Sequence, residues 1–278
     1  INTSGHYQPS FWVHGILGFA NDFYRLAAIL GPDYPVYAFQ ARGLDGKQMP
    51  LMFEEMVSHY IQCLRLVQPQ GPYCLGGLSM GGLIALEMAQ QLKRQGEQIS
   101  HLVMFDTFPP QNTELTQSSN DLRTLLIASM LLSSQKELGI TLADFESLPP
   151  KFQLAHLVKL LADKGNLTLS ARENLYHFLK GPMEILDYVL ETFKVYEPLP
   201  YDASKVWYFK ASKGFVNHSD PTWKLPALEV LDSYDYVAPW RNWIKSDLQV
   251  IEVPSDHFGL FKEPAIEVVK EQLEVLLK

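Results

Sequence analysis

The segment GPYCLGGLSMGGLIALEMAQQLKRQGEQISHLVMFDTFPP, residues 71–110, contains the clearest pattern of alternating strands and helices in the chain. Its short apolar run, residues 73–75, leads into a glycine-rich turn. A stretch of good helix formers, residues 82–95, follows the turn and stops at Gly96. A second apolar run, HLVMFD, then ends at Asp106. This order predicts strand, turn, helix and strand, as in a parallel strand pair joined by a helical crossover.

The same alternation of short apolar runs and helical patterns continues on both sides of this segment. Further strands are expected at residues 11–14, 36–39, 206–210 and 248–253. Further helices are expected at residues 21–30, 51–67 and 264–278. The sequence therefore predicts an α/β fold, with a mostly parallel central sheet flanked by helices on both faces.

The alternation of predicted strands and helices stops between residues 109 and 200. Helical patterns follow one another there at residues 122–132, 152–162 and 183–196, without a convincing strand between them. We therefore expect residues 109–200 to form a helical lid. The lid would be inserted into a core built from residues 1–108 and 201–278.

Composition excludes several classes of protein. The formal net charge is −8, and Lys and Arg do not cluster, which argues against a nucleic-acid partner. No apolar run approaches the roughly 18 residues that span a bilayer. His14, Cys63 and Cys74 lack the spacing of zinc ligands, so no metal is expected. We interpret both cysteines as free thiols in a reducing, cytoplasmic compartment, and the Ile start as the edge of a larger protein.

The pentapeptide Gly77-Leu78-Ser79-Met80-Gly81 matches the G-x-S-x-G pattern. In the α/β-hydrolase fold this pattern forms a sharp strand-to-helix turn that exposes a serine hydroxyl at the top of the sheet. An ordinary glycine turn is the alternative interpretation. The predicted strand before the turn and the predicted helix after it favour Ser79 as a nucleophile, with Gly77 and Gly81 leaving room for the turn.

A serine nucleophile needs a general base and donors for the oxyanion. His257 is the histidine that follows the last predicted strand, where this fold carries its base. His6 is interpreted as a tail residue, and surface or capping roles are expected for His59, His101, His156, His177 and His218. The backbone N–H of Met80 is the first expected oxyanion donor. The second is expected from Ile16, with Gly15 as the alternative.

Two parts of the chain offer carboxylates for the acid that orients His257. Asp106 ends the strand next to the nucleophile strand, so its carboxylate should emerge at the same sheet edge as Ser79. A turn-capping role before Pro109 is the alternative for Asp106. The later candidates are Asp220, Asp232 and Asp235.

Several blocks of the chain resemble the terminal thioesterase domains of modular polyketide synthases and nonribosomal peptide synthetases. The resemblance is carried by YAFQARGLDG, by residues 71–110 and by YVAPWRNWIKSDLQVIEVPSDHFGLFKEP. These domains carry their acid at the place of Asp106, which favours it over the later carboxylates. One departure is Leu78, where many relatives have Trp or His, and it affects the expected shape of the pocket.

The resemblance implies a thioesterase that releases an acyl or peptidyl chain from the phosphopantetheine arm of an upstream carrier protein. It implies an acyl-Ser79 intermediate, released by hydrolysis or macrocyclisation, and no cofactor of the enzyme's own. Alternatives are a free-standing editing thioesterase, an esterase for small esters and a non-catalytic binding scaffold. The sequence leaves the acyl chain and a dimeric state open.

Overall fold

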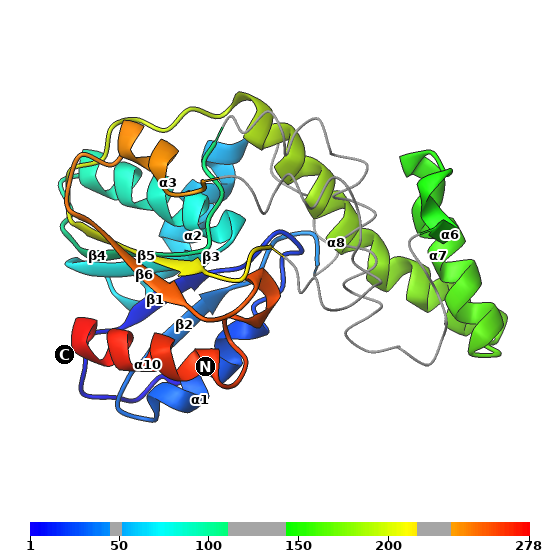
Figure 1. The fold of residues 1–278 in the computed structure, drawn as a ribbon, viewed down its shortest axis with the longest axis horizontal. Helices are drawn as coiled ribbons and strands as arrows, with labels where there is room; N and C mark the ends of the chain where they lie inside the picture. Colours follow the sequence, from blue (N-terminus) through cyan, green and yellow to red (C-terminus); the bar gives the residue numbers. More distant parts are fainter. Residues whose placement is uncertain (45–51, 111–142, 216–234) are drawn as a thin grey trace.

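The computed structural model describes residues 1–44, 52–110, 143–215 and 235–278. In this part of the chain, six strands form one parallel sheet with the order β2-β1-β3-β4-β5-β6 (Figure 1). The strands are β1 (Ser10–Val13), β2 (Val36–Phe39), β3 (Tyr73–Leu78), β4 (Ile99–Phe105), β5 (Lys205–Ala211) and β6 (Leu248–Val253). The predicted parallel sheet is therefore confirmed.

Helices cover both faces of the sheet. On one face lie α2 (Phe53–Val67) and α3 (Met80–Arg94), and on the other lie α1 (Asp22–Leu30) and α10 (Ala265–Leu276) (Figure 1). Strand β1 shows why buried strands of this sheet do not alternate apolar and polar residues. Phe11 and Val13 pack in the core on the α2 and α3 side, whereas Trp12 packs in the core on the α1 and α10 side. Successive side chains of a strand face opposite layers, so a strand covered on both faces needs no polar alternation.

Helix α3 begins at Met80, two residues earlier than the sequence pattern indicates. Gly81 and Gly82 belong to the helix, because only residues without a side chain leave room for the neighbouring Val13 and Thr107. A methyl group added to Gly81 would lie 2.2 Å from the Val13 carbonyl oxygen, and one added to Gly82 would lie 2.0 Å from Thr107 Oγ1. These two positions let the ends of β1 and β4 approach the start of α3, next to Ser79.

The described part of the segment between β4 and β5 is helical. It contains α6 (Ala143–Glu146), α7 (Pro150–Lys164) and α8 (Leu169–Val195), which extend away from the sheet (Figure 1). Helix α7 includes the expected helix 152–162. Helix α8 includes most of the expected helix 183–196 but begins well before it. The expected helix 122–132 lies outside the described residues.

Three side chains of α3 hold the segment that returns from α8 to the sheet. Glu87 is buried and accepts a 2.5 Å hydrogen bond from the Tyr196 hydroxyl. Gln90 donates to the Leu199 carbonyl oxygen, and Lys93 pairs with Asp202. The start of the return segment is thereby fixed to the same helix that begins at the Ser79 turn.

None of the described helices is long and apolar enough to cross a membrane. Both cysteines are free, with Cys74 buried in β3 and Cys63 partly exposed on α2.

Candidate active site

Ser79 lies at a sharp turn between β3 and α3. Its backbone has φ 55° and ψ −123°, a conformation that side-chain-bearing residues seldom adopt. The Ser79 N–H donates a 2.7 Å hydrogen bond to the Phe105 carbonyl oxygen at the end of β4. A methyl group added to Gly77 would lie 2.1 Å from the Gly81 carbonyl, so only glycine fits before this turn. The predicted turn geometry is therefore present.

Asp106 directly follows β4 and also has a positive φ, 44°. Its N–H donates a 2.7 Å bond to the Phe209 carbonyl oxygen on the neighbouring strand. The next residue is fixed too, because the Thr107 carbonyl oxygen accepts from the Tyr208 hydroxyl and from Trp240 Nε1. The Asp106 side chain is thus held over the carboxyl ends of β4 and β5, and Oδ1 accepts the Ala211 N–H at 3.0 Å.

His257 follows β6 and begins a short 3-10 helix, η3 (His257–Gly259). Its Nδ1 lies 2.7 Å from Asp106 Oδ2, and both side chains are buried. A carboxylate accepts hydrogen bonds, so the contact assigns the donor role to Nδ1 and leaves Nε2 as the nitrogen that can take a proton from Ser79. The structure therefore brings Asp106 and His257 together. Ser79 follows β3 and Asp106 follows β4, and the last residues of these two strands, Leu78 and Phe105, are paired in the sheet.

Aromatic side chains surround His257. The ring of Phe215 lies 4.7 Å from the imidazole centroid, that of Phe258 lies 5.3 Å away and that of Phe108 lies 5.6 Å away. Sequence reasoning did not predict this enclosure. Phe108 and Phe258 stand beside the predicted Asp106 and His257 in the sequence, which is a usable signal, whereas nothing marks Phe215.

The two expected oxyanion donors come from neighbouring elements. Met80 is the first residue of α3, so its N–H is among those at the helix N-terminus that the helix leaves unpaired. The loop after β1 lies beside the turn, because a methyl group added to Gly15 would be 3.7 Å from the Leu78 carbonyl oxygen. Ile16 belongs to this loop and is partly buried. Its role as a donor stays a prediction.

Among the later carboxylates, Asp235 is engaged elsewhere. Its Oδ1 accepts the N–H groups of Val237 and Ala238, which caps the short helix η2 (Ala238–Asn242). Asp220 and Asp232 lie outside the described residues, as does His218.

Two other histidines contribute to packing; a surface or capping role was predicted for His101, and no role was predicted for His14. His101 lies in β4, partly buried against Trp207, rather than at the surface. His14 is wholly buried at the end of β1. Among the described residues, no three His, Cys, Asp or Glu side chains gather as a metal site.

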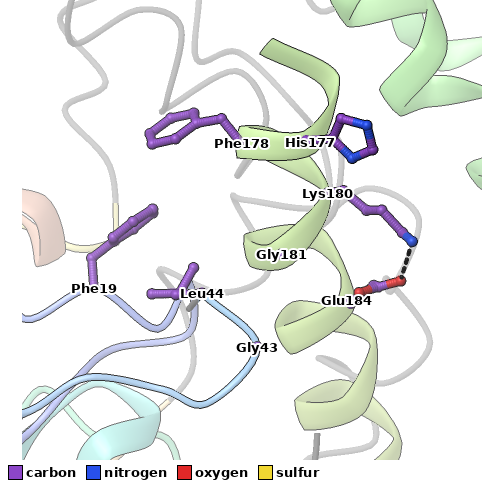
Figure 2. Close-up of a pocket in the computed structure, with 8 residues that line it drawn as sticks. All are labelled: Phe19, Gly43, Leu44, His177, Phe178, Lys180, Gly181 and Glu184. Atoms are coloured by element: carbon purple, nitrogen blue, oxygen red, sulfur yellow. Dashed lines mark ion pairs between the residues drawn. The ribbon is translucent and has the colours of Figure 1, made fainter. Parts of the chain in front are cut away.

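A cavity of about 360 Å³ lies between α8 and the loops that follow β1 and β2. Figure 2 shows Phe19 and Leu44 from the two loops and Phe178 from α8 on one side of the helix. The Phe19 and Phe178 rings stack with their centroids 6.2 Å apart. Lys180, on the same helix, pairs with Glu184 at 3.4 Å. The lining thus combines three apolar side chains with the polar side chains of His177, Lys180 and Glu184.

The profile of the family described as "Thioesterase domain" matches residues 8–274. The chain belongs to this family. This thioesterase domain is 29% identical over 287 residues to the polyketide synthase PksR of Bacillus subtilis (strain 168), covering 95% of the chain and 11% of the relative. It is 28% identical over 283 residues to the dimodular nonribosomal peptide synthase of the same organism, covering 100% of the chain and 11% of the relative.

The thioesterase domain thus spans about a tenth of the length of these curated relatives, each of which is a much larger synthase. Among solved structures, the NocB thioesterase domain from the nocardicin cluster superposes with a TM-score of 0.62. That comparison has 21% identity and covers 100% of this chain and 96% of the other. The fold is therefore that of the α/β-hydrolase thioesterases, as expected from the Ser79 turn.

Proposed function

We propose that this thioesterase domain releases an acyl or peptidyl chain from the phosphopantetheine thioester of a carrier protein, through an acyl-Ser79 intermediate. The observation that carries the proposal is the buried 2.7 Å contact between His257 and Asp106 at the sheet edge where the strained Ser79 turn lies. The two multidomain relatives make polyketide or peptide assembly the setting we propose, with an upstream carrier domain as partner.

Acylation would begin with attack of the Ser79 hydroxyl oxygen on the thioester carbon. The Ser79 proton passes to His257 Nε2, because Asp106 holds the Nδ1 proton and stabilises the imidazolium. We propose that the N–H groups of Met80 and Ile16 donate hydrogen bonds to the former carbonyl oxygen and stabilise its negative charge. Collapse of this intermediate breaks the carbon–sulfur bond, and the leaving pantetheine sulfur takes the proton from His257.

Deacylation would reverse the roles. His257 Nε2 accepts a proton from the second nucleophile, which attacks the acyl-Ser79 ester, and returns that proton to the Ser79 oxygen as it leaves. Water as the nucleophile gives a free acid, and a hydroxyl or amine of the chain itself gives a macrocycle. No cofactor enters either half of the proposed cycle. The rings of Phe108, Phe215 and Phe258 would limit the access of water to the imidazole.

We also propose that residues 109–200 act as the lid that selects the acyl chain. The described helices α7 and α8 share an apolar cluster with Phe108, Phe215 and Tyr236, so the inserted segment packs directly onto the loops around His257. The cavity of Figure 2 would then be part of the acyl path. A cytoplasmic location is proposed from the two free thiols.

The direct test of the nucleophile is Ser79→Ala. We expect thioester cleavage of an acyl-pantetheine to fall to background while the melting temperature is unchanged, because one hydroxyl is lost from a turn that the flanking glycines preform. Ser79→Cys is expected to be acylated and to turn over slowly. The control is Ser58→Ala on the exposed side of α2, with wild-type turnover. Cleavage retained by Ser79→Ala would overturn the proposal.

A further inference from the structure

His14 is a buried histidine that has no role in the reaction steps proposed above. It follows β1 and precedes Gly15 and Ile16, the loop beside the Ser79 turn. Its side chain is 0% exposed, and both ring nitrogens have partners. Nδ1 lies 2.7 Å from the Gly15 carbonyl oxygen, and Nε2 lies 2.7 Å from the Tyr60 hydroxyl.

These two contacts fix the protonation of the ring. A carbonyl oxygen only accepts hydrogen bonds, so His14 Nδ1 carries the proton and donates it to Gly15. Nε2 is then an acceptor, and the Tyr60 hydroxyl donates to it. Burial lowers the pKa of His14 to about 4, which keeps the ring neutral near pH 7. Burial also raises the pKa of Tyr60, so its proton stays available for donation.

The phenol is itself held in place by packing. The Tyr60 ring stacks on Phe39 with centroids 5.0 Å apart and meets the His14 ring edge-on at 5.9 Å. Tyr60 lies on α2 and is 2% exposed. The chain of donors therefore starts from a rigid helix and ends on the loop after β1.

The Gly15 carbonyl belongs to the same planar peptide unit as the Ile16 N–H. This peptide is not among the cis bonds of the described chain, so its C=O and N–H point in opposite directions. The carbonyl oxygen accepts from His14 and also from the Gly18 N–H, at 3.0 Å. With the oxygen fixed by two donors, the opposite direction of the Ile16 N–H is fixed as well.

We propose that His14 and Tyr60 are positioning residues that orient the Gly15–Ile16 peptide, so that the Ile16 N–H is held ready as the second oxyanion donor. The inference rests on the proposed function. The loop is already adjacent to the turn, since a methyl group added to Gly81 would lie 2.2 Å from the Val13 oxygen and 2.5 Å from the His14 oxygen. A preset N–H stabilises the transition state more than the ground state, so its loss should lower kcat rather than raise KM.

The test uses variants at both residues, assayed on one acyl-pantetheine thioester. His14→Phe keeps an aromatic ring and removes both nitrogens, and we expect kcat to fall about 10–100-fold with KM nearly unchanged. This loss is smaller than the roughly 10²–10³-fold cost of deleting an oxyanion donor, because the N–H is misdirected but still present. Tyr60→Phe removes only the hydroxyl and should lower kcat by about 3–10-fold.

His14→Asn separates positioning from packing, because its amide N–H can replace the Nδ1–H toward the Gly15 carbonyl. We expect it to recover a large part of the kcat lost in His14→Phe, although it fills the site less well. Melting temperatures are measured in parallel, and His6→Phe, at an exposed histidine of the N-terminal segment, is the control with wild-type kcat.

Two results would overturn the inference alone. One is wild-type kcat in folded His14→Phe, and the other is a kcat loss in His14→Phe that follows melting temperature and is not recovered by His14→Asn. Wild-type protein that cannot cleave the thioester would overturn the proposed function together with the inference. If His14→Phe does not fold, an unchanged kcat in folded Tyr60→Phe would still contradict it.

Discussion

Backbone strain in the described chain is concentrated at the residues that carry the proposed chemistry. Its non-glycine residues with positive φ are Ser79, Asp106 and Asn166. Such conformations cost about 1–3 kcal/mol each and persist where the surroundings determine them. Ser79 and Asp106 donate their N–H groups to Phe105 and Phe209, which explains how two adjacent strand ends maintain both turns.

Asp106→Asn should be severely impaired in catalysis. An amide in place of the carboxylate cannot stabilise the imidazolium of His257, and it can favour the wrong tautomer by donating to Nδ1. We expect kcat on an acyl thioester to fall by about 10⁴-fold, the loss seen where such an aspartate is the sole partner of the histidine.

Asp235→Asn and Asp232→Asn are the matched controls, and each should cost far less. Asp235 accepts two backbone N–H groups of η2, so its replacement disturbs a cap rather than the base. A severe loss at Asp232 or Asp235, with near-normal Asp106→Asn, would move the acid to the later position and this chain toward the editing type.

The sequence predicted these residues unequally well. Ser79 follows from a motif with a strand before it and a helix after it, and His257 follows from its place after the last strand. Asp106 was favoured over the later carboxylates, but the sequence alone does not show which loop brings its carboxylate to the histidine. His14 could not be predicted at all, since its importance comes from a hydrogen bond to a helix 46 residues away in the chain.

Strands were easier to predict than the ends of helices. The pattern predicted β6 with the observed bounds, and β1 within one residue, because buried parallel strands are apolar and bounded by turn residues. Helix α3 starts earlier than predicted because Gly81 and Gly82 provide close approach to β1 and Thr107. The attachment of α3 to the return segment through Glu87 and Tyr196 is tertiary, so local sequence could not predict it.

Helix α8 is expected to influence which chain is accepted rather than how the thioester is cleaved. Phe178 lines the cavity beside Phe19, and Phe178→Ala would enlarge the cavity by removing the ring that stacks on Phe19 (Figure 2). We expect the ratio of kcat/KM between long and short acyl-pantetheines to shift toward longer chains by about 3–10-fold. Competition assays with mixed chain lengths measure this ratio directly.

Phe152→Ala is the control for this substitution, because Phe152 is an exposed phenylalanine on α7 that does not line the cavity. It should leave the chain-length preference unchanged. An equal shift in both variants, or none in Phe178→Ala, would contradict a role for α8 in selecting the acyl chain.

The sheet and the inserted helices are joined into one structure by apolar packing. The cluster that contains Leu157 and Val158 of α7 and Leu186 of α8 also contains Phe108 and Phe215, which touch His257. Displacement of the helices would therefore change the surroundings of the proposed base. This contact between the inserted helices and the loops around His257 could not be predicted from the sequence, because the helical pattern shows an apolar face without showing its partner.

The central claim is that thioester cleavage proceeds through an ester on Ser79. It is tested most directly by mixing wild-type protein with an acyl-pantetheine thioester, quenching early and measuring the intact mass, followed by peptide mapping. We expect a mass increase equal to one acyl group, located on Ser79 and absent from Ser79→Ala. An acyl group on another residue, or on Ser79→Ala in equal yield, would contradict it.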